Sequence, residues 1–494
     1  MSIRIVETVI ADTTAELRRG REAAEARADV VELRIDGVRD LDLAAVLADR
    51  TAPAIVTCRP VWEGGRYDGV EPDRLRLLRR ARALGAEFID VEVRADWRSV
   101  AALDRAERPA EAGDGLVLSF HDFSGVPADL ETIAAGMAQS GADVVKIAVT
   151  VDRLDQCERL RRIGQALRTG VVIGMGPAGA ITRVAPQLFN SRWTYAGPLE
   201  ALGQMSVHAL RDTCGAGRVT PRAALYGVAG RPVMHSKSPD LHNAAFRHEG
   251  LDALYVPLAA ADFDDFLAFA ASFDLAGASV TAPFKGDALA AAGSAGEAAR
   301  ATGAANTLKR TAGGWHADNT DPAGFLAPLS GVELRGMNAA IIGRGGASRA
   351  VAHALSAAGA RVSVIGREDL DRASEPWDLL VHATPVGTAP DTSASVLAGL
   401  PIRARIVYDL VYNPRDTRLL ADAAEAGARV IGGLPMLVEQ ACRQFEIWFD
   451  RPAPRDAYAR AAARIASAEE RSGALGAPRA TRPGGVQGPP PTKS

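Results

Sequence analysis

The first 215 residues repeat one pattern eight times, and this repetition limits the possible folds more than any other feature of the chain. Each repeat has a short apolar run that is typical of a buried strand, followed in most cases by a segment with helical periodicity. Most runs lie roughly 20 to 30 residues apart, which is the spacing of alternating strands and helices. The eight runs are residues 3–9, 30–35, 53–58, 87–93, 115–120, 144–149, 171–175 and 193–197. We therefore predict an α/β protein with an N-terminal (β/α)8 barrel over residues 1–215.

The rest of the chain predicts a second α/β region. Residues 212–222 break the repeat and are typical of a linker, and a strand pattern begins again at 223–230. Residues 337–368 contain a strand, a glycine-rich turn, a helix and a second strand, which is the order of a Rossmann-like unit. The last residues, 472–494, are rich in Pro, Gly and Ser, so we expect a disordered tail there.

Composition argues against several classes of partner. The formal net charge is −3, which gives no reason to expect nucleic acid or an anionic membrane as a partner. No apolar run reaches the roughly 18 residues that span a bilayer, and the N-terminus has neither a signal-peptide nor a transit-peptide pattern. We therefore expect a cytoplasmic protein. The four cysteines have no zinc spacing, so we expect free thiols and no metal site; they are Cys58, Cys157, Cys214 and Cys442.

Polar residues stand at the carboxyl ends of the predicted barrel strands, where barrel enzymes place their active sites. Lys146 is the most unusual of them, because it interrupts an apolar strand and lysine is rarely buried without a partner. Burial among apolar neighbours would lower the pKa of this amine, and a neutral amine attacks a ketone to form a Schiff base. His121 is the predicted general base, because imidazole titrates near neutral pH, and Arg59 and Arg183 are suited to bind a carboxylate. The simpler alternative is a lysine whose amine reaches water from the strand. The remaining candidates at these strand ends are Glu32, Arg34, Asp36, Glu63, Met175 and Gln204.

Three barrel motifs, VELRID (31–36), SFHDF (119–123) and GADVVKIAV (141–149), resemble type I 3-dehydroquinate dehydratase, the Schiff-base enzyme of the shikimate pathway. The resemblance covers residues 1–215. It implies that Lys146 forms an imine with the substrate ketone. The implied substrate-binding residues are Glu32, Arg34, Arg59, Arg183 and Gln204.

The same resemblance implies roles for the residues around the imine. His121 would remove the C2 proton and later protonate the departing C1 hydroxyl, and Glu63 would orient His121. Met175 and Phe123 would pack around the substrate ring. One difference concerns the loop after the eighth strand, where the family commonly has Ser-Ala-Pro-Gly-Gln and this chain has Glu200 at the serine position. A carboxylate near the substrate carboxylate is unfavourable, so we expect loop closure to be affected.

The second region has its own polar motifs. Ser236 and Ser238 stand just before a Pro-initiated helix, where hydroxyl groups cap the helix or bind an anion. Three further segments place polar side chains after strands or in turns, and each by itself is typical of a turn. These side chains are Thr281 and Lys285 in GASVTAPFKGD, Asn306 in GAANTLKR, and Asn319 and Asp321 in HADNTDPAGF.

Together with GGLPMLVEQACRQF (432–445), these motifs resemble shikimate dehydrogenase from about residue 224 to 465. The resemblance implies a substrate lobe over about 224–325, completed by a C-terminal helix, and an NADP lobe over about 335–435. Lys285 and Asp321 would form the catalytic pair, because reduction of a ketone by hydride needs a proton at its oxygen. The implied substrate-binding residues are Ser236, Ser238, Thr281, Asn306, Tyr412 and Gln440.

The glycine-rich turn predicts a dinucleotide site between a strand and a helix, with Gly343, Gly345, Gly346 and Ala347 as its residues. Arg367 ends the next strand, where arginine favours the 2′-phosphate of NADP and an acidic residue favours NAD. Glu368 opposes this preference by repelling the phosphate or by occupying Arg367, and Arg372 supports it if a helix begins near Asp369. We predict NADP as the cofactor, by a modest margin. The chain also differs from the family at His382, where family members carry Asn.

The two resemblances imply consecutive reactions, since the first enzyme makes 3-dehydroshikimate and the second reduces it. We therefore expect a bifunctional lyase and NADP-dependent oxidoreductase that acts on small-molecule substrates; the sequence does not predict its oligomeric state. Three alternatives stay open: a metabolite-sensing regulator built on the same domain pair, a quinate/shikimate dehydrogenase that uses NAD, and a Schiff-base aldolase barrel. The presence of Lys146, His121, Lys285 and Asp321 argues against the regulator. The lack of a glycine-rich phosphate loop after the last two barrel strands argues against the aldolase.

Overall fold

The computed structural model describes residues 3–98 and 115–474 of the chain. Contacts divide the chain into two compact units, and we describe each by itself. The first consists of Met1–Ala323 and Gln440–Pro454, and the second consists of Gly324–Glu439 and Arg455–Ser494. The predicted domain boundaries at residues 215 and 224 fall within the first unit and stay predictions.

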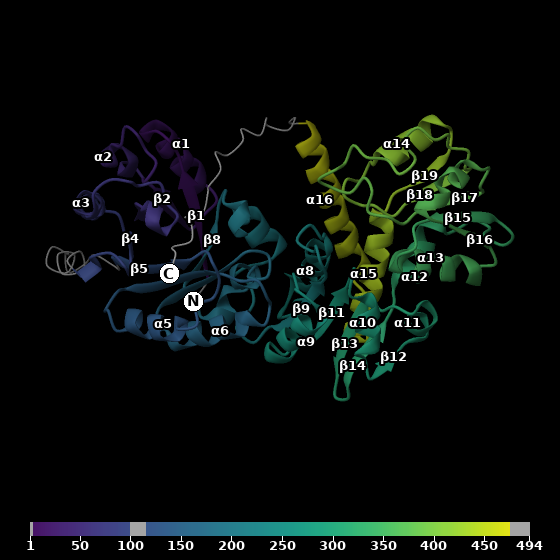
Figure 1. Cartoon of the computed structure of the whole chain (residues 1–494), viewed down its shortest axis with the longest axis horizontal. Helices are drawn as coiled ribbons and strands as arrows, with labels where there is room; N and C mark the ends of the chain where they lie inside the picture. The colour runs from purple at the N-terminus through teal and green to yellow at the C-terminus, as the bar shows by residue number, and fades with distance from the viewer. Residues whose placement is uncertain (1–2, 99–114, 475–494) are drawn as a thin grey trace, which may run out of the picture. The chain divides into compact units, whose positions relative to one another are not determined.

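Eight parallel strands form the barrel of the first unit (Figure 1). Their order is β7-β6-β5-β4-β3-β2-β1-β8, and a parallel bridge between Gly170 and Ser191 joins β7 to the chain just before β8. This bridge nearly closes the sheet, so the predicted barrel and all eight predicted strands are confirmed. The strands are β1 (Arg4–Ile10), β2 (Val30–Arg34), β3 (Ala54–Thr57), β4 (Phe88–Glu92), β5 (Leu116–Asp122), β6 (Val144–Thr150), β7 (Gly170–Met175) and β8 (Trp193–Ala196).

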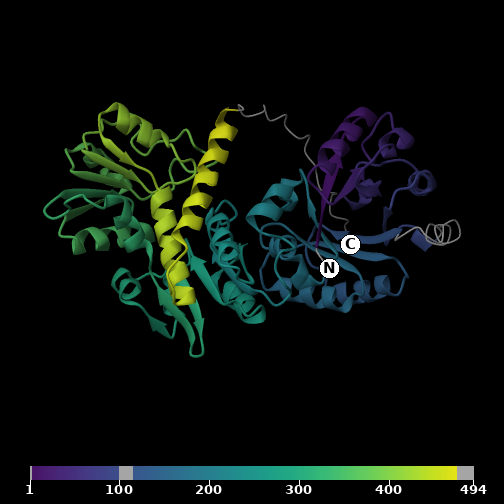
Figure 2. The same ribbon diagram turned by 180° about the vertical axis from the view of Figure 1, so that it is seen from behind.

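Helices between the strands cover the outside of the barrel. Local sequence signals begin two of them, because the side chains of Thr13 and Asp42 accept hydrogen bonds from backbone N–H groups of the first turn that follows. Two helices lie next to each other in both views (Figures 1 and 2) and are joined by an ion pair between Glu131 and Arg159. The helices are α1 (Thr14–Glu25), α2 (Leu43–Leu47), α3 (Glu71–Ala83), the neighbouring α5 (Leu130–Ala138) and α6 (Gln156–Ala166), and α7 (Ile181–Val184). Short helical turns are η1 (Val61–Glu63), η2 (Pro186–Phe189), η3 (Glu200–Leu202) and η4 (Ala209–Thr213).

The barrel interior changes from apolar to polar along the strands. Alternate residues of a strand face the same side, so each strand contributes a series of inward side chains. The apolar layer near the amino ends contains Val6, Val30, Ile55, Phe88, Val117, Val144, Val171 and Trp193. Two residues further along, six of these strands carry a buried polar side chain, namely Thr8, Glu32, Thr57, Asp90, Ser119 and Lys146. Lys146 therefore lies in a polar layer inside the barrel, which rules out the alternative that its amine reaches water from a strand edge.

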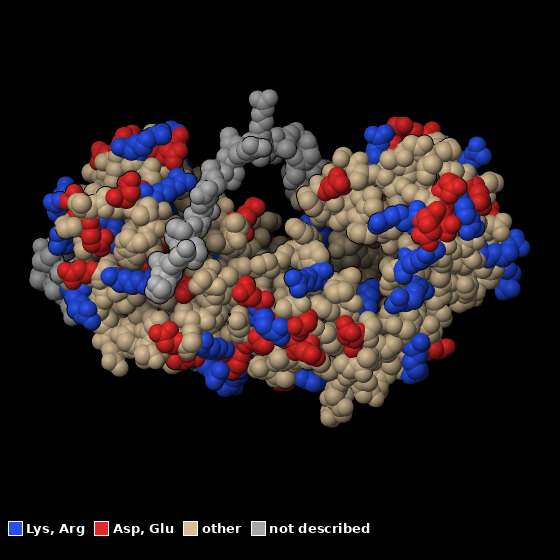
Figure 3. Space-filling view, in the orientation of Figure 1, with Lys and Arg blue, Asp and Glu red and all other residues tan. Residues whose placement is uncertain are grey.

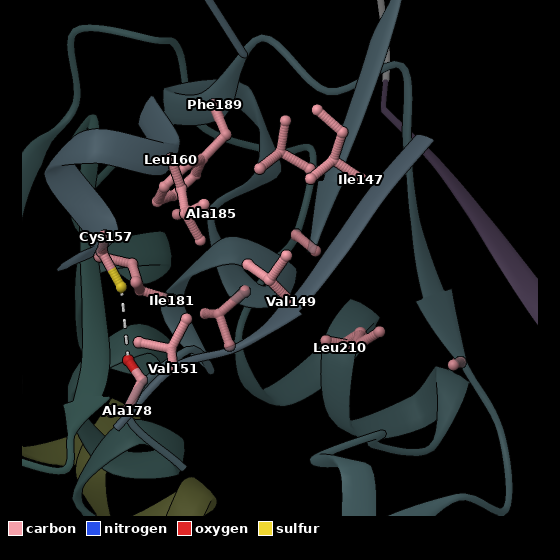
Figure 4. Close-up of a cluster of buried hydrophobic side chains, with 14 of the residues drawn as sticks. Ile147, Val149, Val151, Cys157, Leu160, Ala178, Ile181, Ala185, Phe189 and Leu210 are labelled. Atoms are coloured by element: carbon pink, nitrogen blue, oxygen red, sulfur yellow. Dashed lines mark hydrogen bonds between the residues drawn. The ribbon is translucent and has the colours of Figure 1, made fainter. Parts of the chain in front are cut away.

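A second apolar layer fills the space between the strands and the surrounding helices. Figure 4 shows part of it, in which Ile147 and Val149 of β6 face Leu160 of α6 and Phe189 of η2. Cys157 is buried in the same cluster, and its thiol lies 3.5 Å from the carbonyl oxygen of Ala178. Since odd and even residues of β6 face opposite sides, the apolar neighbours of Lys146 in the sequence pack outside the barrel.

A six-stranded mixed sheet forms the other part of the first unit, in the order β10-β9-β11-β13-β14-β12. Its first three strands are parallel, and β13 pairs antiparallel with both β11 and β14. The strands are β9 (Ala224–Ala229), β10 (Ala253–Leu258), β11 (Gly277–Val280), β12 (Ser294–Ala295), β13 (Thr307–Thr311) and β14 (Gly314–Asp318). The helices are α8 (Ser238–His248), α9 (Phe263–Ser272), α10 (Lys285–Ala290), α11 (Glu297–Thr302) and α12 (Asp321–Leu326), which continues into the second unit and is followed there by the turn η5 (Ala327–Leu329).

A fully buried carboxylate joins this sheet region to the barrel. Asp265 of α9 accepts hydrogen bonds from the backbone N–H groups of Leu154 and Asp155, at 3.0 and 2.9 Å, in the loop after β6. The predicted linker, residues 212–222, starts in η4 and buries Cys214 as it crosses to β9. The linker is therefore a packed connection.

The second unit is built on a five-stranded parallel sheet in the order β16-β15-β17-β18-β19. Apolar clusters cover both of its faces, and the strand, turn, helix and strand predicted for 337–368 are confirmed. The strands are β15 (Asn338–Ile342), β16 (Arg361–Ile365), β17 (Leu379–His382), β18 (Ile406–Asp409) and β19 (Arg429–Ile431). The helices are α13 (Gly346–Ala357), η6 (Arg367–Ser374), α14 (Arg418–Glu425), α15 (Leu434–Phe449), which continues into the first unit, and α16 (Arg455–Ala474). The predicted tail overlaps the end of α16 at residues 472–474 and otherwise lies outside the described residues.

Candidate active sites

The Lys146 amine lies between two carboxylates at the centre of the polar layer. Its Nζ atom is 2.9 Å from Oδ2 of Asp90 and 3.4 Å from Oε1 of Glu32, and it lies 4.3 Å from the centre of the Tyr195 ring. Residues 56 and 114 positions away thus meet Lys146 because the strands close into a barrel. The three charged groups are all buried.

The prediction that the pKa of Lys146 is lowered is wrong. Burial by itself lowers the pKa of the amine, but the neighbouring carboxylates of Asp90 and Glu32 raise it by more, so the pKa lies above its ordinary value. The expectation assumed apolar neighbours, whereas the inward face of the barrel supplies two anions. Lys146 is therefore an ammonium ion at neutral pH in the free protein.

Arg59 holds the other side of the same network. Its Nη2 atom donates to Asp90 at 2.9 Å, and its Nη1 atom donates to Glu92 at 2.6 Å and to the hydroxyl of Ser119 at 2.9 Å. Arg74 also pairs with Glu92, at 2.7 Å. Both terminal nitrogens of Arg59 are thus engaged by the protein, and its predicted contact with substrate stays a prediction.

His121 and Glu63 form a hydrogen-bonded pair beside this network. The imidazole Nδ1 atom lies 3.0 Å from Oε1 of Glu63, and the same oxygen accepts from the backbone N–H of His121 at 3.0 Å. The predicted orienting contact is therefore present, although its catalytic role stays a prediction.

The prediction that His121 titrates near neutral pH is wrong. Burial and the positive charges of Arg59 and Lys146 hold the pKa of His121 well below its ordinary value, so the ring is neutral. Burial raises the pKa of Glu63 to about 7, against the opposing effect of Arg59. A neutral imidazole held by a carboxyl group is the form required of a general base.

Arg183 is a buried cation whose partners are neutral. Its Nη1 atom donates to the carbonyl oxygen of Gly174 at 2.6 Å, and its Nη2 atom donates to that of Leu202 at 2.9 Å. Its Nε atom has no hydrogen-bond partner among the described residues. Burial lowers the pKa of Arg183 to about 10, which shows how strongly this cation is desolvated. Such a group is suited to bind an anion.

The other predicted barrel residues lie at the same ends of the strands. Arg34 makes a bidentate pair with Asp36 at 2.8 and 2.9 Å, and Gln204 accepts a hydrogen bond from the backbone N–H of Leu199. Met175 is buried, whereas Phe123 is 44% exposed and stacks against the His121 ring. Glu200 is exposed in η3.

Sequence reasoning missed two central carboxylates, Asp90 and Glu92. Both interrupt the apolar run of β4 at alternate positions, which is the same signal that identified Lys146 in β6. Alternation places both residues on the inward face of the strand, so they belong to the candidate site.

The predicted catalytic pair of the second region is formed in the first unit. Lys285 Nζ lies 2.5 Å from Oδ2 of Asp321, and Asn306 donates to the other oxygen of Asp321 at 2.7 Å. The Asn306 amide also reaches Oε1 of Gln440 at 3.4 Å and the hydroxyl of Thr320 at 2.9 Å. Four predicted residues from three helices and a strand start are thus brought together: Lys285, Asn306, Asp321 and Gln440.

The two serines lie at the start of α8, but the expected cap is shifted. Ser238 is the first residue of the helix, and the hydroxyl of Ser236 accepts a hydrogen bond from its backbone N–H at 3.2 Å. Neither serine is the N-cap residue, because Lys237 occupies that position. Thr281 follows β11 and its methyl group faces Gly230, where an added Cβ would lie 2.2 Å from it. Asn319 turns inward and donates to the hydroxyl of Thr302, so it supports the loop before Asp321.

Tyr412 and the predicted cofactor residues belong to the second unit. Gly343 has a φ of +119°, which favours glycine, and the hydroxyl of Ser348 donates to its carbonyl oxygen at 2.6 Å. A Cβ at Gly345 would meet no protein atom within 4 Å, so open space adjoins this turn at the start of α13. Gly346 and Ala347 are the first residues of that helix. A tight turn, open space and a helix start fit the pyrophosphate of a dinucleotide.

Arg367 is exposed at the end of β16, as predicted, and no ion pair of Arg367 occurs among the described residues. Glu368 does not occupy Arg367, because it pairs with Arg344 of the glycine-rich turn. The helical segment η6 begins at Arg367, two residues before the start on which the support from Arg372 depends, and it is kinked at Asp369. Arg372 pairs with Glu375, at 3.7 Å.

His382 is fully buried between two side chains of the second unit. One ring nitrogen lies 2.9 Å from Oδ1 of Asp409 and the other lies 2.5 Å from the hydroxyl of Thr384. Asp409 also accepts from the hydroxyl of Thr417 at 2.6 Å and from the backbone N–H of Val411. His382 thus supports the loops that follow β17 and β18, next to Gly343.

The described residues contain no cluster of side chains suited to hold a metal ion, and their four cysteines are free and buried. None of the described helices has both the length and the apolar character needed to cross a membrane. On the face drawn in Figure 3, acidic and basic side chains of the described residues are interspersed.

Comparisons with known proteins match both halves of the chain. Residues 5–216 match the model for type I 3-dehydroquinase. Residues 228–308 match the model for the shikimate dehydrogenase substrate binding domain, and residues 433–462 match that for the shikimate 5'-dehydrogenase C-terminal domain.

Some relatives match most of the chain and others match about half of it. A bifunctional 3-dehydroquinate dehydratase/shikimate dehydrogenase of Arabidopsis thaliana is 32% identical over 487 residues, which covers 88% of this chain and 80% of the relative. A shikimate dehydrogenase (NADP(+)) of Microcystis aeruginosa is 37% identical and covers 48% of this chain and 95% of the relative. A solved shikimate 5-dehydrogenase of Thermus thermophilus, in complex with NADP(H) and shikimate, is 34% identical over 49% of this chain and 99% of that chain, with a TM-score of 0.44. The chain belongs to the family of bifunctional 3-dehydroquinate dehydratase/shikimate dehydrogenases.

Proposed function

We propose that the chain dehydrates 3-dehydroquinate to 3-dehydroshikimate in the barrel and reduces that product to shikimate with NADPH in its second half. The observation that carries the proposal is the buried Lys146 amine, held by two carboxylates, with a neutral imidazole on the neighbouring strand. The name of the Arabidopsis relative, which matches across both halves, supports the pairing of the two reactions.

The raised pKa of Lys146 is compatible with imine formation. The free amine is the attacking form, but the net reaction converts an ammonium ion and a ketone to a protonated imine and water. The positive charge at Nζ is therefore the same before and after imine formation. Asp90 and Glu32, which stabilise the ammonium ion, stabilise the protonated imine in the same way. The carboxylates thus hold the charge in place while the covalent bond forms.

His121 moves the proton in the elimination. β5 and β6 are neighbouring strands, and Ser119 of β5 lies opposite Lys146 of β6. His121 is the next residue of β5 after Ser119 that faces the same side, so it lies one inward-facing position further toward the carboxyl ends than Lys146. The neutral ring takes the C2 proton of the imine, and the electron pair of the C–H bond passes toward the imine nitrogen. Because its pKa is held low, the protonated ring readily returns the proton to the departing C1 hydroxyl, which leaves as water. Hydrolysis of the remaining imine releases 3-dehydroshikimate and restores Lys146.

Arg183 is the proposed binding group for the substrate carboxylate. It is a buried cation with an unpartnered Nε atom and carries no carboxylate partner among the described residues. Binding an anion relieves the cost of keeping this cation desolvated. Glu32, Arg34, Arg59 and Gln204 are the further proposed substrate contacts at these strand ends.

Lys285 and Asp321 are the proposed proton source for the reduction. The ammonium group donates a proton to the ketone oxygen as the alcohol forms, and the carboxylate next to it returns the amine to its charged form. Asn306 and Gln440 orient Asp321 and the substrate hydroxyls, with Ser236, Ser238, Thr281 and Tyr412 as further proposed contacts.

The second unit is suited to bind NADP, which supplies the hydride when bound. The open space beside Gly345 accommodates the pyrophosphate at the start of α13. Arg367 provides an exposed guanidinium at the end of the adjacent strand, where the adenosine ribose lies in this fold. The NADP(+) in the name of the Microcystis relative supports this choice of cofactor.

One experiment tests both activities. The protein is supplied with 3-dehydroquinate and NADPH, and the products are identified, with borohydride added in a parallel reaction without NADPH. We expect shikimate in the first reaction and a ligand-sized mass on the Lys146 peptide in the second. Recovery of unchanged 3-dehydroquinate, or an adduct on another lysine, would overturn the proposal for the barrel. Better use of quinate and NAD than of shikimate and NADP would overturn the proposal for the second half.

A further inference from the structure

Arg344 occupies an unexpected place in the dinucleotide turn. β15 and β16 are neighbouring parallel strands with Ile342 opposite Ile365, so the residues that follow them lie at the same edge of the sheet. Arg344 follows β15 in the glycine-rich turn, and its guanidinium pairs with Glu368, which follows β16. A second nitrogen of Arg344 lies 3.7 Å from Asp369. The cationic side chain of the turn thus reaches the acidic segment beside the ribose position.

Without its ion pair to Arg344, the carboxylate of Glu368 would favour NAD over NADP. An acidic residue at the end of the second strand of this fold hydrogen-bonds the free 2′-hydroxyl of NAD and repels the 2′-phosphate of NADP. Glu368 stands next to that strand end, beside Arg367. The pairing with Arg344 neutralises Glu368 and leaves Arg367 without an ion pair among the described residues.

We infer that Arg344 is a specificity-determining residue for NADP, which acts by holding the carboxylate of Glu368 away from the 2′-phosphate and from Arg367. The inference rests on the proposed NADP-dependent reduction. It accounts for an acidic side chain at a position where NADP enzymes need positive charge. Both side chains are more than half exposed, at 59% and 58%, so the pair is accessible to a nucleotide and to salt.

The test compares nucleotide affinities rather than activity. Calorimetric titration of the full chain with NADP, NAD, 2′,5′-ADP and 5′-AMP gives the ratio of affinities with and without the 2′-phosphate. The variants are Arg344→Gln, Glu368→Gln and the double variant. Arg335→Gln is the matched control, because Arg335 is an exposed arginine that precedes β15 and so lies at the opposite edge of the sheet.

We expect Arg344→Gln to lower the NADP-to-NAD affinity ratio about tenfold, because it frees the Glu368 carboxylate beside the phosphate. Glu368→Gln should raise the ratio, and the double variant should stay within about threefold of Glu368→Gln. The ratio for 2′,5′-ADP against 5′-AMP should change in parallel, and Arg335→Gln should leave both ratios unchanged.

Two results would overturn the inference while leaving the proposed function intact. An unchanged ratio in Arg344→Gln would mean that Arg344 does not influence the phosphate site. An equal loss in the presence and absence of Glu368 would mean that Arg344 does not act through that carboxylate. A wild-type chain that binds neither NADP nor 2′,5′-ADP would overturn the proposed cofactor and this inference together.

Discussion

The carboxylate of Asp90 should control the charge of the Lys146 amine, and Asp90→Asn tests this directly. The Nζ–Oδ2 distance is 2.9 Å and both groups are buried. At an effective dielectric constant of about 20, two unit charges at that distance attract by about 6 kcal/mol. That energy corresponds to about 4 pKa units.

The expected shift is smaller than this limit for two structural reasons. The asparagine oxygen still accepts a hydrogen bond from the amine, and Glu32 stays 3.4 Å away. We therefore expect Asp90→Asn to lower the pKa of Lys146 by about 2 to 3 units. The variant also leaves Arg59 with only Glu92 as an anionic partner, so the folded protein should lose about 3 to 5 kcal/mol of stability.

The assay is covalent trapping of the imine at saturating 3-dehydroquinate with cyanoborohydride, followed by mass spectrometry between about pH 6 and 10. Because the free amine is the attacking species and the pKa of Lys146 lies above its ordinary value, trapping should become faster as pH rises through this range, and it should be faster in Asp90→Asn than in the wild type at each pH. Glu92→Gln is the matched control: it removes an equally buried carboxylate that contacts Arg59 and Arg74 but makes no contact with Lys146. Equal trapping rates for the wild type and Asp90→Asn at every pH, in folded protein, would refute the argument that this ion pair sets the amine's charge.

Three further predictions address separate parts of the chain. Lys146→Ala should abolish dehydration and leave shikimate oxidation nearly unchanged, and Lys285→Ala should do the reverse; loss of both activities in one folded variant would contradict two separate sites. The pKa of Glu63 is raised from about 4.5 to about 7, so the folded protein binds the proton more tightly and loses that stabilisation as pH rises between these values. Glu63→Gln should therefore raise the free energy of unfolding by up to about 3 kcal/mol at pH 8 and change it little at pH 5, which thermal unfolding at the two pH values measures. A larger gain in stability at pH 5 than at pH 8 would contradict this pH dependence. His382→Phe should destabilise the protein by about 3 to 5 kcal/mol in thermal unfolding, because it removes the ring that pairs with the buried Asp409, and His382→Asn should cost less because its amide still donates.

The strands and the turns were predictable because their signals are local. Each barrel strand is a short apolar run between helical segments, and the dinucleotide turn is identified by its glycines. Lys146, His121, Lys285 and Asp321 stood out because each breaks such a pattern or belongs to a family motif. Residues whose type departs from a local pattern can be found without knowing the fold.

Partners and charge states were not predictable in the same way. The pKa shift of Lys146 was predicted in the wrong direction. The side chains that determine this shift come from β2 and β4, and only barrel closure brings them to β6. The pairing of Glu368 with Arg344 depends likewise on the parallel register of β15 and β16. The amino-acid sequence by itself determined the period of each strand, and so which residues share a face. The tertiary structure decided which faces meet, and electrostatic interactions depend on that because they fall off with distance through space, whatever the separation along the chain.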